Sequence, residues 1–170
     1  MRKFVKLSAG ALAIAAAAGC STGHPQKADA HTSGPRVEVC KKASEGEIAS
    51  LFDRWNTALQ SGNAKSVVAL YDEGSILLPT VSNKPRLTPA EKEDYFAHWM
   101  VNKPVGKIDM RHIQIDCNKA VDSGLYTFTY ANGKKVQARY TYTYRWDGKD
   151  WKISSHHSSA LPEKPGAAAH

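Results

Sequence analysis

Polar side chains that could do chemistry follow an aromatic residue near the end of the chain. Trp151 and Ile153 alternate with polar residues, as in a strand with one buried face. The same phase continues through Ser155, His157 and Ser159. Alternate residues of a strand share a face, so we expect His157 and Ser159 to point inward. They predict a polar-lined pocket in which His157 is either a hydrogen-bonded structural residue, which we favour, or a catalytic base.

Aromatic residues supply most of the remaining wall of this predicted pocket. Tyr140, Tyr142 and Tyr144 alternate along the preceding strand and should share its inner face. Buried tyrosine hydroxyls need hydrogen-bond partners, so their convergence with His157 favours a polar-lined cavity over a plain core. The candidate pocket or ligand-contacting residues are Trp55, Tyr71, Trp99, Arg111, Tyr126, Tyr142, His157 and Ser159.

The adjacent residues His156 and His157 do not predict a metal site. Neighbouring residues in a strand point to opposite faces, so the two imidazoles cannot share one ion. We expect His156 on the outer face of the sheet, where it could lie in a subunit interface. No metal, no other cofactor and no catalytic residue is assigned.

An enzyme in this pocket would need a carboxylate or imidazole with a shifted pKa. Asp109, near the start of a strand, is the one inward acid that the pattern indicates, and it could pair with His157. A buried inward acid would favour an enzyme. An apolar or self-complementary outer sheet face around Thr141, Thr143 and Arg145 would favour assembly.

Start signals and apolar spacing predict three helices. In the first, Ser44 and Glu47 form a capping box ahead of apolar residues at helical spacing, and Gly62 ends the helix. Asn63 caps a shorter second helix that ends at Gly74. The third begins at residues 88–91, where a proline at N1 accompanies a second capping box.

Strands make up the rest of the predicted domain. Residues 76–78 form a short buried strand, and from residue 106 onward the apolar period changes to two. Long strands are expected at 108–117, 120–130, 136–146 and 151–159, with tight turns at Asn132-Gly133 and Asp147-Gly148. This order predicts an α+β domain. A strongly curved antiparallel sheet of one short and four long strands would wrap around the three N-terminal helices as a cone with a cavity at its wide end.

The first nineteen residues have the pattern of an export signal. Arg2, Lys3 and Lys6 precede a small and apolar run that ends at Cys20 and is too short to remain as a transmembrane helix. We favour a bacterial lipoprotein signal, with Cys20 lipidated and the protein held on the periplasmic side of the outer membrane by this anchor alone. Ordinary secretion as a soluble protein is the alternative. The predicted organisation is a signal peptide at 1–19, a tether at 20–36, one globular domain at 37–163 and a disordered tail at 164–170.

Charge and cysteine content bound the partners and the compartment. Three residues of the leader contribute to the net charge of +7, and the other basic residues are scattered among acidic ones. No nucleic-acid surface is therefore expected. Of the three cysteines, Cys40 and Cys117 remain beside Cys20, and we expect them to form a disulfide in an oxidising compartment. Two separate buried thiols are the alternative.

The sequence also resembles a known family. The segments FDRWNTALQSGNAKSVVALY and WDGKDWKISSHHSSALPE, with the strand pattern between them, are similar to the association (hub) domain of calcium/calmodulin-dependent protein kinase II. This domain belongs to the nuclear-transport-factor-2-like superfamily of cone-shaped folds, and the resemblance, to a bacterial exported member, covers residues 45–163. It implies self-association as dimers or larger rings and a pocket of ligand size. It does not imply kinase activity, because the chain lacks the Gly-rich, His-Arg-Asp and Asp-Phe-Gly motifs.

The pocket positions of this chain depart from the hub pattern. Where the hub has arginines that receive carboxylates, the matching residues are Tyr126, Tyr142 and Ser158. Arg111 and Arg139 could replace that charge, and Arg111 is the better candidate because Arg139 is out of phase with the tyrosines.

Besides a purely structural oligomer whose sheet face pairs through Thr141, Thr143 and Arg145, two functional hypotheses follow. The first is a non-catalytic envelope module that self-associates, or binds a small organic ligand in the cone pocket, or does both. The second is a cone-fold enzyme of the isomerase, dehydratase or cyclase type that uses His157 with an acid such as Asp109.

Overall fold

The computed structural model describes residues 39–163. The predicted signal peptide, the lipidation site Cys20, the tether and the C-terminal tail lie outside them. In the described part of the chain, no helix is both long enough and apolar enough to cross a membrane.

The helices begin at the predicted capping residues. They are α1 (Glu45–Gln60), α2 (Ala64–Val68), α3 (Pro89–Trp99) and a short 3-10 helix, η1 (Met100–Asn102). Thr88 and Glu91 form a reciprocal capping box at α3, as predicted. At α1, the Ser44 hydroxyl accepts a hydrogen bond from the backbone N–H of Glu47 at 3.1 Å. The Glu47 carboxylate instead accepts from the indole N–H of Trp151 at 3.0 Å, so this side chain joins α1 to the sheet.

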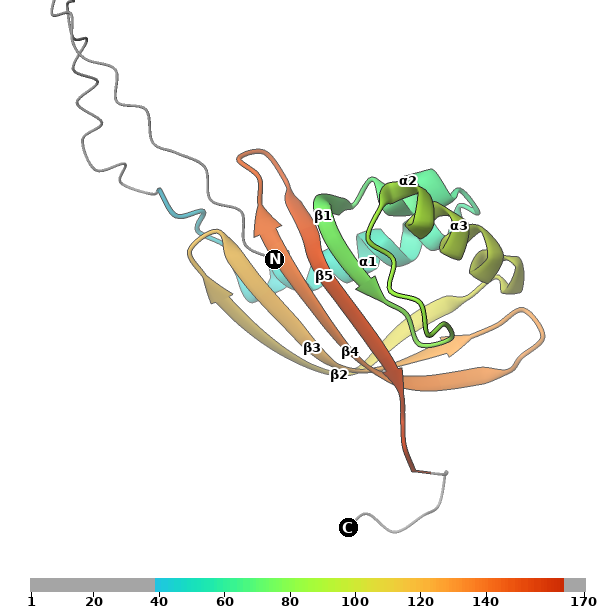
Figure 1. The fold of residues 1–170 in the computed structure, drawn as a ribbon. Coiled ribbons are helices and arrows are strands. Elements are labelled where there is room, and N and C mark those ends of the chain that lie inside the picture. Colours follow the sequence, from blue (N-terminus) through green and yellow to red (C-terminus); the bar gives the residue numbers. More distant parts are fainter. Residues whose placement is uncertain (1–38, 164–170) are drawn as a thin grey trace, which may run out of the picture. The chain divides into compact units, whose positions relative to one another are not determined.

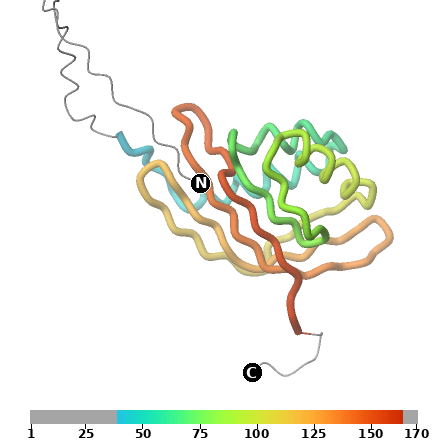
Figure 2. The backbone as a smooth tube through the Cα atoms, in the orientation of Figure 1, coloured from blue at the N-terminus to red at the C-terminus, as the bar shows by residue number. Residues whose placement is uncertain are grey.

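The strands form one curved sheet, which confirms the predicted α+β class. They are β1 (Tyr71–Leu78), β2 (Val105–Asp116), β3 (Lys119–Thr129), β4 (Lys135–Trp146) and β5 (Trp151–Ala160). The order in the sheet is β1-β5-β4-β3-β2, and the curving strands face the helices (Figure 1; Figure 2). The four long strands are antiparallel, but β1 pairs with β5 in parallel, so the sheet is mixed.

The first strand begins earlier than expected. Tyr71 and Gly74, predicted to lie in and end the second helix, both belong to β1. Gly74 has a φ of 75°, a left-handed conformation that glycine adopts without steric cost. It therefore marks an irregularity within the strand, where the pairing register with β5 shifts, rather than a helix end.

Two β-bulges invert the inward phase of their strands. In β2, Ile108 pairs with Tyr126 and Met110 with Leu125, which leaves Asp109 as the extra residue. Beyond it, Arg111 is the inward residue. A second bulge lies in β5. Each extra residue moves the following side chains to the opposite face of the sheet.

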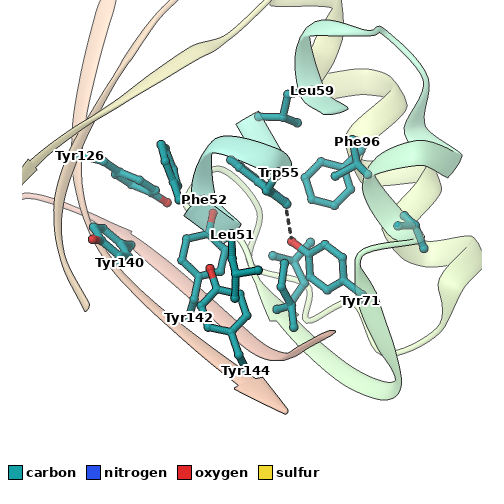
Figure 3. Packing of buried hydrophobic residues seen from close by; sticks show 14 of the residues in the cluster. Leu51, Phe52, Trp55, Leu59, Tyr71, Phe96, Tyr126, Tyr140, Tyr142 and Tyr144 are labelled. Atoms are coloured by element: carbon teal, nitrogen blue, oxygen red, sulfur yellow. Dashed lines mark hydrogen bonds between the residues drawn. The ribbon is translucent and has the colours of Figure 1, made fainter. Parts of the chain in front are cut away.

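Aromatic residues fill the space between α1 and the sheet. Phe52 and Trp55 of α1 are 2% and 1% exposed. The Trp55 ring lies 5.7 Å from that of Tyr142, and the Phe52 ring lies 6.3 Å from those of Tyr126 and Tyr142. Figure 3 shows Tyr126, Tyr140, Tyr142 and Tyr144 facing this side of α1. The tyrosines of β3 and β4 are therefore part of the core as well as candidates for a pocket.

The predicted disulfide between Cys40 and Cys117 is present, with its Cα atoms 4.7 Å apart. It joins the segment before α1 to the turn between β2 and β3, where the backbone N–H of Lys41 also donates to Asn118 Oδ1 at 2.9 Å. The bridge closes a separation of 77 residues, which restricts the unfolded chain.

Replacing Cys40 and Cys117 together by serine should lower the free energy of unfolding by about 2–4 kcal/mol, because the unfolded chain regains loop entropy. Urea denaturation measures the change. Wild-type protein treated with a reductant should shift by the same amount. Equal midpoints for the oxidised wild type and the double variant would contradict a stabilising role.

Candidate functional site

A β-bulge in β5 decides which polar residues point inward. Thr143 pairs with Ser155 and Tyr144 with Ile153, so Ser154 is the extra residue. After this bulge the inward positions are even-numbered. His156 is 3% exposed and Ser158 is 6% exposed.

The prediction that His157 and Ser159 point inward, with His156 outside, is therefore wrong. His157 is exposed and pairs with Thr141 across the outer face of the sheet, while Ser159 is half-buried. The prediction extended the phase of Trp151 and Ile153 without a break. A serine pair at the bulge carried no signal, such as glycine, that would have marked the extra residue.

A small cavity lies between β3, β4, β5, α3 and the loop that follows β1. Its volume is about 20 Å³. By the same measure one water needs about 10–15 Å³, so the cavity admits a ligand of only a few atoms. Its polar groups near β5 are Thr80, Tyr126, His156 and Ser158, and the rest of the lining is Trp55, Leu77, Pro79, Val81, Tyr95, Phe96, Trp99, Phe128, Tyr130, Val136 and Ala138.

The predicted pocket residues divide into three groups. Trp55, Trp99 and Tyr126 line the cavity. Tyr71 and Tyr142 lie behind it, where both contact His156. The remaining candidates Arg111, His157 and Ser159 do not line it, and sequence reasoning missed Thr80, His156 and, as a pocket residue of this chain, Ser158.

Three hydroxyl groups meet at one side of the cavity. The Tyr126 hydroxyl donates to Ser158 Oγ at 2.5 Å, and Ser158 Oγ shares a second hydrogen bond with Thr80 Oγ1. Tyr126 is 2% exposed, and burial raises its pKa above the ordinary value, so this phenol stays protonated. Thr80 itself is only half-buried. The hydroxyls therefore form a chain that ends close to solvent.

His156 faces the same cavity as a neutral imidazole. Its ring stacks on Tyr142 with centroids 4.0 Å apart and meets the edge of Trp55 at 5.4 Å. Nδ1 lies 2.8 Å from the Tyr71 hydroxyl, which also accepts from the Trp55 indole N–H at 3.3 Å (Figure 3). Burial, and secondarily the neighbouring His157, lower the pKa of His156 to about 3.

This lowered pKa predicts a pH dependence of stability. The unfolded chain takes up a proton near pH 6.5, whereas folded His156 does so only near pH 3. The stability that neutral His156 contributes is thus fully present above about pH 6.5 and is lost as the pH falls. Between pH 7 and pH 4 the wild type should lose about 3 kcal/mol more than a His156→Phe variant, measured by urea denaturation.

The matched control for that measurement is His157→Phe, which should keep most of the wild-type pH dependence because burial is the main cause of the lowered pKa of His156. The interpretation fails if removing His156 leaves the difference between pH 7 and pH 4 unchanged.

A second polar cluster lies on the inner face of the sheet, on β2, β3 and β4. Asp122 is fully buried and accepts from the Tyr140 hydroxyl at 2.9 Å, and Arg111 Nε lies 3.2 Å from Oδ1 and 3.1 Å from Oδ2 of its carboxylate. Burial raises the pKa of Asp122, against the lowering effects of Tyr140 and Arg111. The Arg111 guanidinium also lies over the Phe52 ring, 6.0 Å from its centroid. Arg111 thus faces the interior but neutralises an acid of this chain.

The catalytic pair Asp109/His157 is not brought together in an interior site. Asp109 is the bulged residue of β2, is exposed and accepts from the Thr127 hydroxyl at 2.5 Å. The buried inward acid is Asp122, which shares the phase of Tyr126 and Phe128 in β3. Within residues 39–163, no three His, Cys, Asp or Glu side chains gather in a way that could hold a metal ion.

Comparison with known proteins identifies the family. A sequence profile of the calcium/calmodulin dependent protein kinase II association domain matches residues 44–162. The chain belongs to this family. The association domain of this chain is 45% identical to a solved structure described as such a domain from Xanthomonas campestris, with a TM-score of 0.66 over 75% of this chain and 99% of that chain.

More distant structures share the fold of the association domain. An NTF2-like protein from Pseudomonas putida is 18% identical, with a TM-score of 0.63 over 72% of this chain and 90% of that one. The iota-carbonic anhydrase of a cyanobacterium, complexed with bicarbonate, is 20% identical, with a TM-score of 0.65 over 74% of this chain and 97% of that one. No curated protein sequence matches the chain. The fold thus occurs both in an enzyme and in proteins without a described reaction.

Proposed function

We propose that the association domain binds an oxyanion of bicarbonate size in the cavity at His156 and interconverts it with carbon dioxide. The observation that carries this proposal is the combination of size and polarity. The space of about 20 Å³ is small, which favours a ligand of few atoms, and one edge of it carries an imidazole and three hydroxyls. The rest of the wall is largely aromatic, which suits an apolar gas.

The similarity to a bicarbonate-binding carbonic anhydrase supports the same reaction. That protein shares the fold over nearly its whole length and was solved with a ligand of the required size. Hydration of carbon dioxide is the reverse of a dehydration, so the proposal falls within the dehydratase alternative. The proposed residues differ from those of that alternative, because the histidine is His156 rather than His157 and Asp109 takes no part.

His156, Ser158 and Thr80 each have a role in the proposed hydration. Water forms a bond to the carbon of carbon dioxide, one C=O bond loses its π character, and the water loses a proton. His156 Nε2 donates a hydrogen bond to the oxygen on which negative charge develops, which stabilises the transition state more than the apolar substrate. As Ser158 Oγ accepts the proton that the water loses, it passes its own hydrogen to Thr80 Oγ1, and Thr80 releases its hydrogen to water or a buffer base outside the cavity. Asp122 lies outside the cavity lining and does not touch the reactants.

Stopped-flow measurement of carbon dioxide hydration by the full chain tests the proposal. The wild type should exceed the buffer rate in proportion to protein concentration. Ser158→Ala should lower kcat/KM at least about tenfold, because it removes the middle of the hydroxyl chain, whereas the half-buried neighbour variant Ser159→Ala should match the wild type. A wild-type rate equal to that of buffer would refute the reaction.

Self-association is a second proposed function, supported by the family and by the outer sheet face. On this outer face, Met110 of β2 is 52% exposed and pairs with Leu125 of β3. Thr141 and Thr143 lie on the same face of β4, the next strand. Arg145 is occupied within the chain, since its guanidinium lies 2.6 Å from Asp72. Native mass spectrometry should show a defined oligomer that Met110→Lys weakens. A monomer at micromolar concentration would contradict self-association.

A further inference from the structure

A buried hydrogen-bond chain leads from α1 to the functional imidazole. The indole N–H of Trp55 lies 3.3 Å from the Tyr71 hydroxyl oxygen, and that oxygen lies 2.8 Å from His156 Nδ1. Trp55, Tyr71 and His156 are 1%, 7% and 3% exposed, so water does not compete for these groups. Three elements, α1, β1 and β5, contribute one residue each. The chain is therefore set by the fold rather than by a flexible surface.

The direction of this chain follows from the chemistry of its first member. An indole nitrogen can only donate, so the Tyr71 oxygen must accept from Trp55. The single hydroxyl hydrogen of Tyr71 then has His156 Nδ1 as its acceptor. The opposite arrangement, with Nδ1–H donating to Tyr71, would leave the buried phenol hydrogen without a partner among the described residues. Such a loss disfavours that arrangement by about tenfold or more.

We propose that Tyr71, oriented by Trp55, is a positioning residue that holds His156 as its Nε2–H tautomer and so makes the cavity a site for hydrogen-bond acceptors. His156 Nε2 is buried and has no hydrogen-bond partner among the described residues, which leaves its hydrogen available to a ligand. This inference deepens the proposed function and rests on it for the identity of the ligand. The assignment of the tautomer does not depend on the proposed function.

The hydroxyl side of the cavity also offers a hydrogen-bond donor, as His156 Nε2 does. The Tyr126 hydrogen is used on Ser158, and one hydrogen serves the bond between Ser158 and Thr80, whichever of the two donates. The other of these two hydroxyls keeps a hydrogen that this chain does not use. The cavity therefore presents an imidazole N–H and a hydroxyl O–H. Carboxylates, bicarbonate and the oxygens of carbon dioxide accept such bonds, whereas ammonium and other pure donors do not.

Nitrogen-15 NMR of the histidine rings in the full chain tests the tautomer without any ligand. The expected His156 pattern is a protonated Nε2 and an unprotonated Nδ1 from pH 5 to pH 8. In Tyr71→Phe the Nδ1 signal should move toward that of a protonated nitrogen or an average of both tautomers, because its donor is gone. The matched control is Tyr144→Phe, which also removes a buried hydroxyl but one without a partner among the described residues, and it should keep the wild-type pattern.

Titration with sodium bicarbonate and with ammonium chloride tests the polarity of the cavity. Bicarbonate should shift the His156 Nε2 signal and ammonium should not, and Tyr71→Phe should weaken the bicarbonate response about tenfold. A protonated Nδ1 in the wild type, or an unchanged pattern in Tyr71→Phe, would overturn the positioning role. An Nε2–H pattern with no response to bicarbonate would instead uphold the tautomer and refute the proposed ligand.

Discussion

A His156→Phe variant is expected to hydrate carbon dioxide about a hundredfold to a thousandfold more slowly than the wild type, measured as kcat/KM. The substitution removes the Nε2–H donor, and loss of one oriented donor to a developing oxyanion has an effect of this size. Phenylalanine keeps a flat ring where His156 stacks on Tyr142 at 4.0 Å, so the shape of the core is retained. The Tyr71 hydroxyl loses its acceptor, which should cost about 1 kcal/mol of stability.

The adjacent histidine provides the matched control. His157→Phe changes the same residue type by the same amount, but on the exposed outer face. Its kcat/KM should stay within about twofold of the wild type, as expected for a surface substitution. The assignment of His156 would be wrong if the two variants lost activity equally, or if His157→Phe lost more.

An Asp122→Ala variant is expected to lose about 3 kcal/mol in free energy of unfolding, measured by urea denaturation. Removing one member of a buried charge pair leaves the other without compensation, which is more costly than losing the pair. Here Arg111 and the Tyr140 hydroxyl both lose their acceptor, and a fully buried side chain is truncated. The Arg111 side chain is 23% exposed and regains some hydration, which keeps the loss at the low end for a buried pair.

Two further variants separate charge from packing at this cluster. Asp122→Asn keeps the shape and one acceptor oxygen, so it should lose about half as much as the alanine variant. Combining Asp122→Ala with Arg111→Met should restore part of the loss, because no unpaired charge remains. If the double variant is no more stable than Asp122→Ala alone, the uncompensated charge of Arg111 is not the cause.

Most of the fold could be predicted from the sequence because its signals are local. Caps at Ser44, Asn63 and Thr88 place the helix starts to the residue. The two-residue apolar period places the four long strands within a few residues of their observed bounds. The cysteine count predicts the bridge from Cys40 to Cys117.

Alternation alone could not predict which residues point inward along the full length of a strand. Period two holds only while the ladder is regular, and the extra residues Asp109 and Ser154 each invert it. Bulges depend on pairing with the neighbouring strand, which a single strand's pattern does not contain. For this reason His157, and not His156, was predicted to face the pocket.

The buried acid was missed for a different reason. Asp122 keeps the regular phase of Tyr126 and Phe128 in β3, so alternation alone would have placed it inside. Asp109 was instead predicted to be the one inward acid, and Asp122 was not considered. In the structure Arg111 and Tyr140 hold its carboxylate, and both come from other strands. The buried inward acid that would favour an enzyme is thus present, although it does not line the cavity.

A crystal structure of the domain grown with sodium bicarbonate would test the central claim most directly. The account predicts one bicarbonate in the cavity, with an oxygen at hydrogen-bond distance from His156 Nε2 and another from the Ser158 or Thr80 hydroxyl. Bicarbonate bound instead at Arg111, or a cavity that holds only water at saturating bicarbonate, would contradict it.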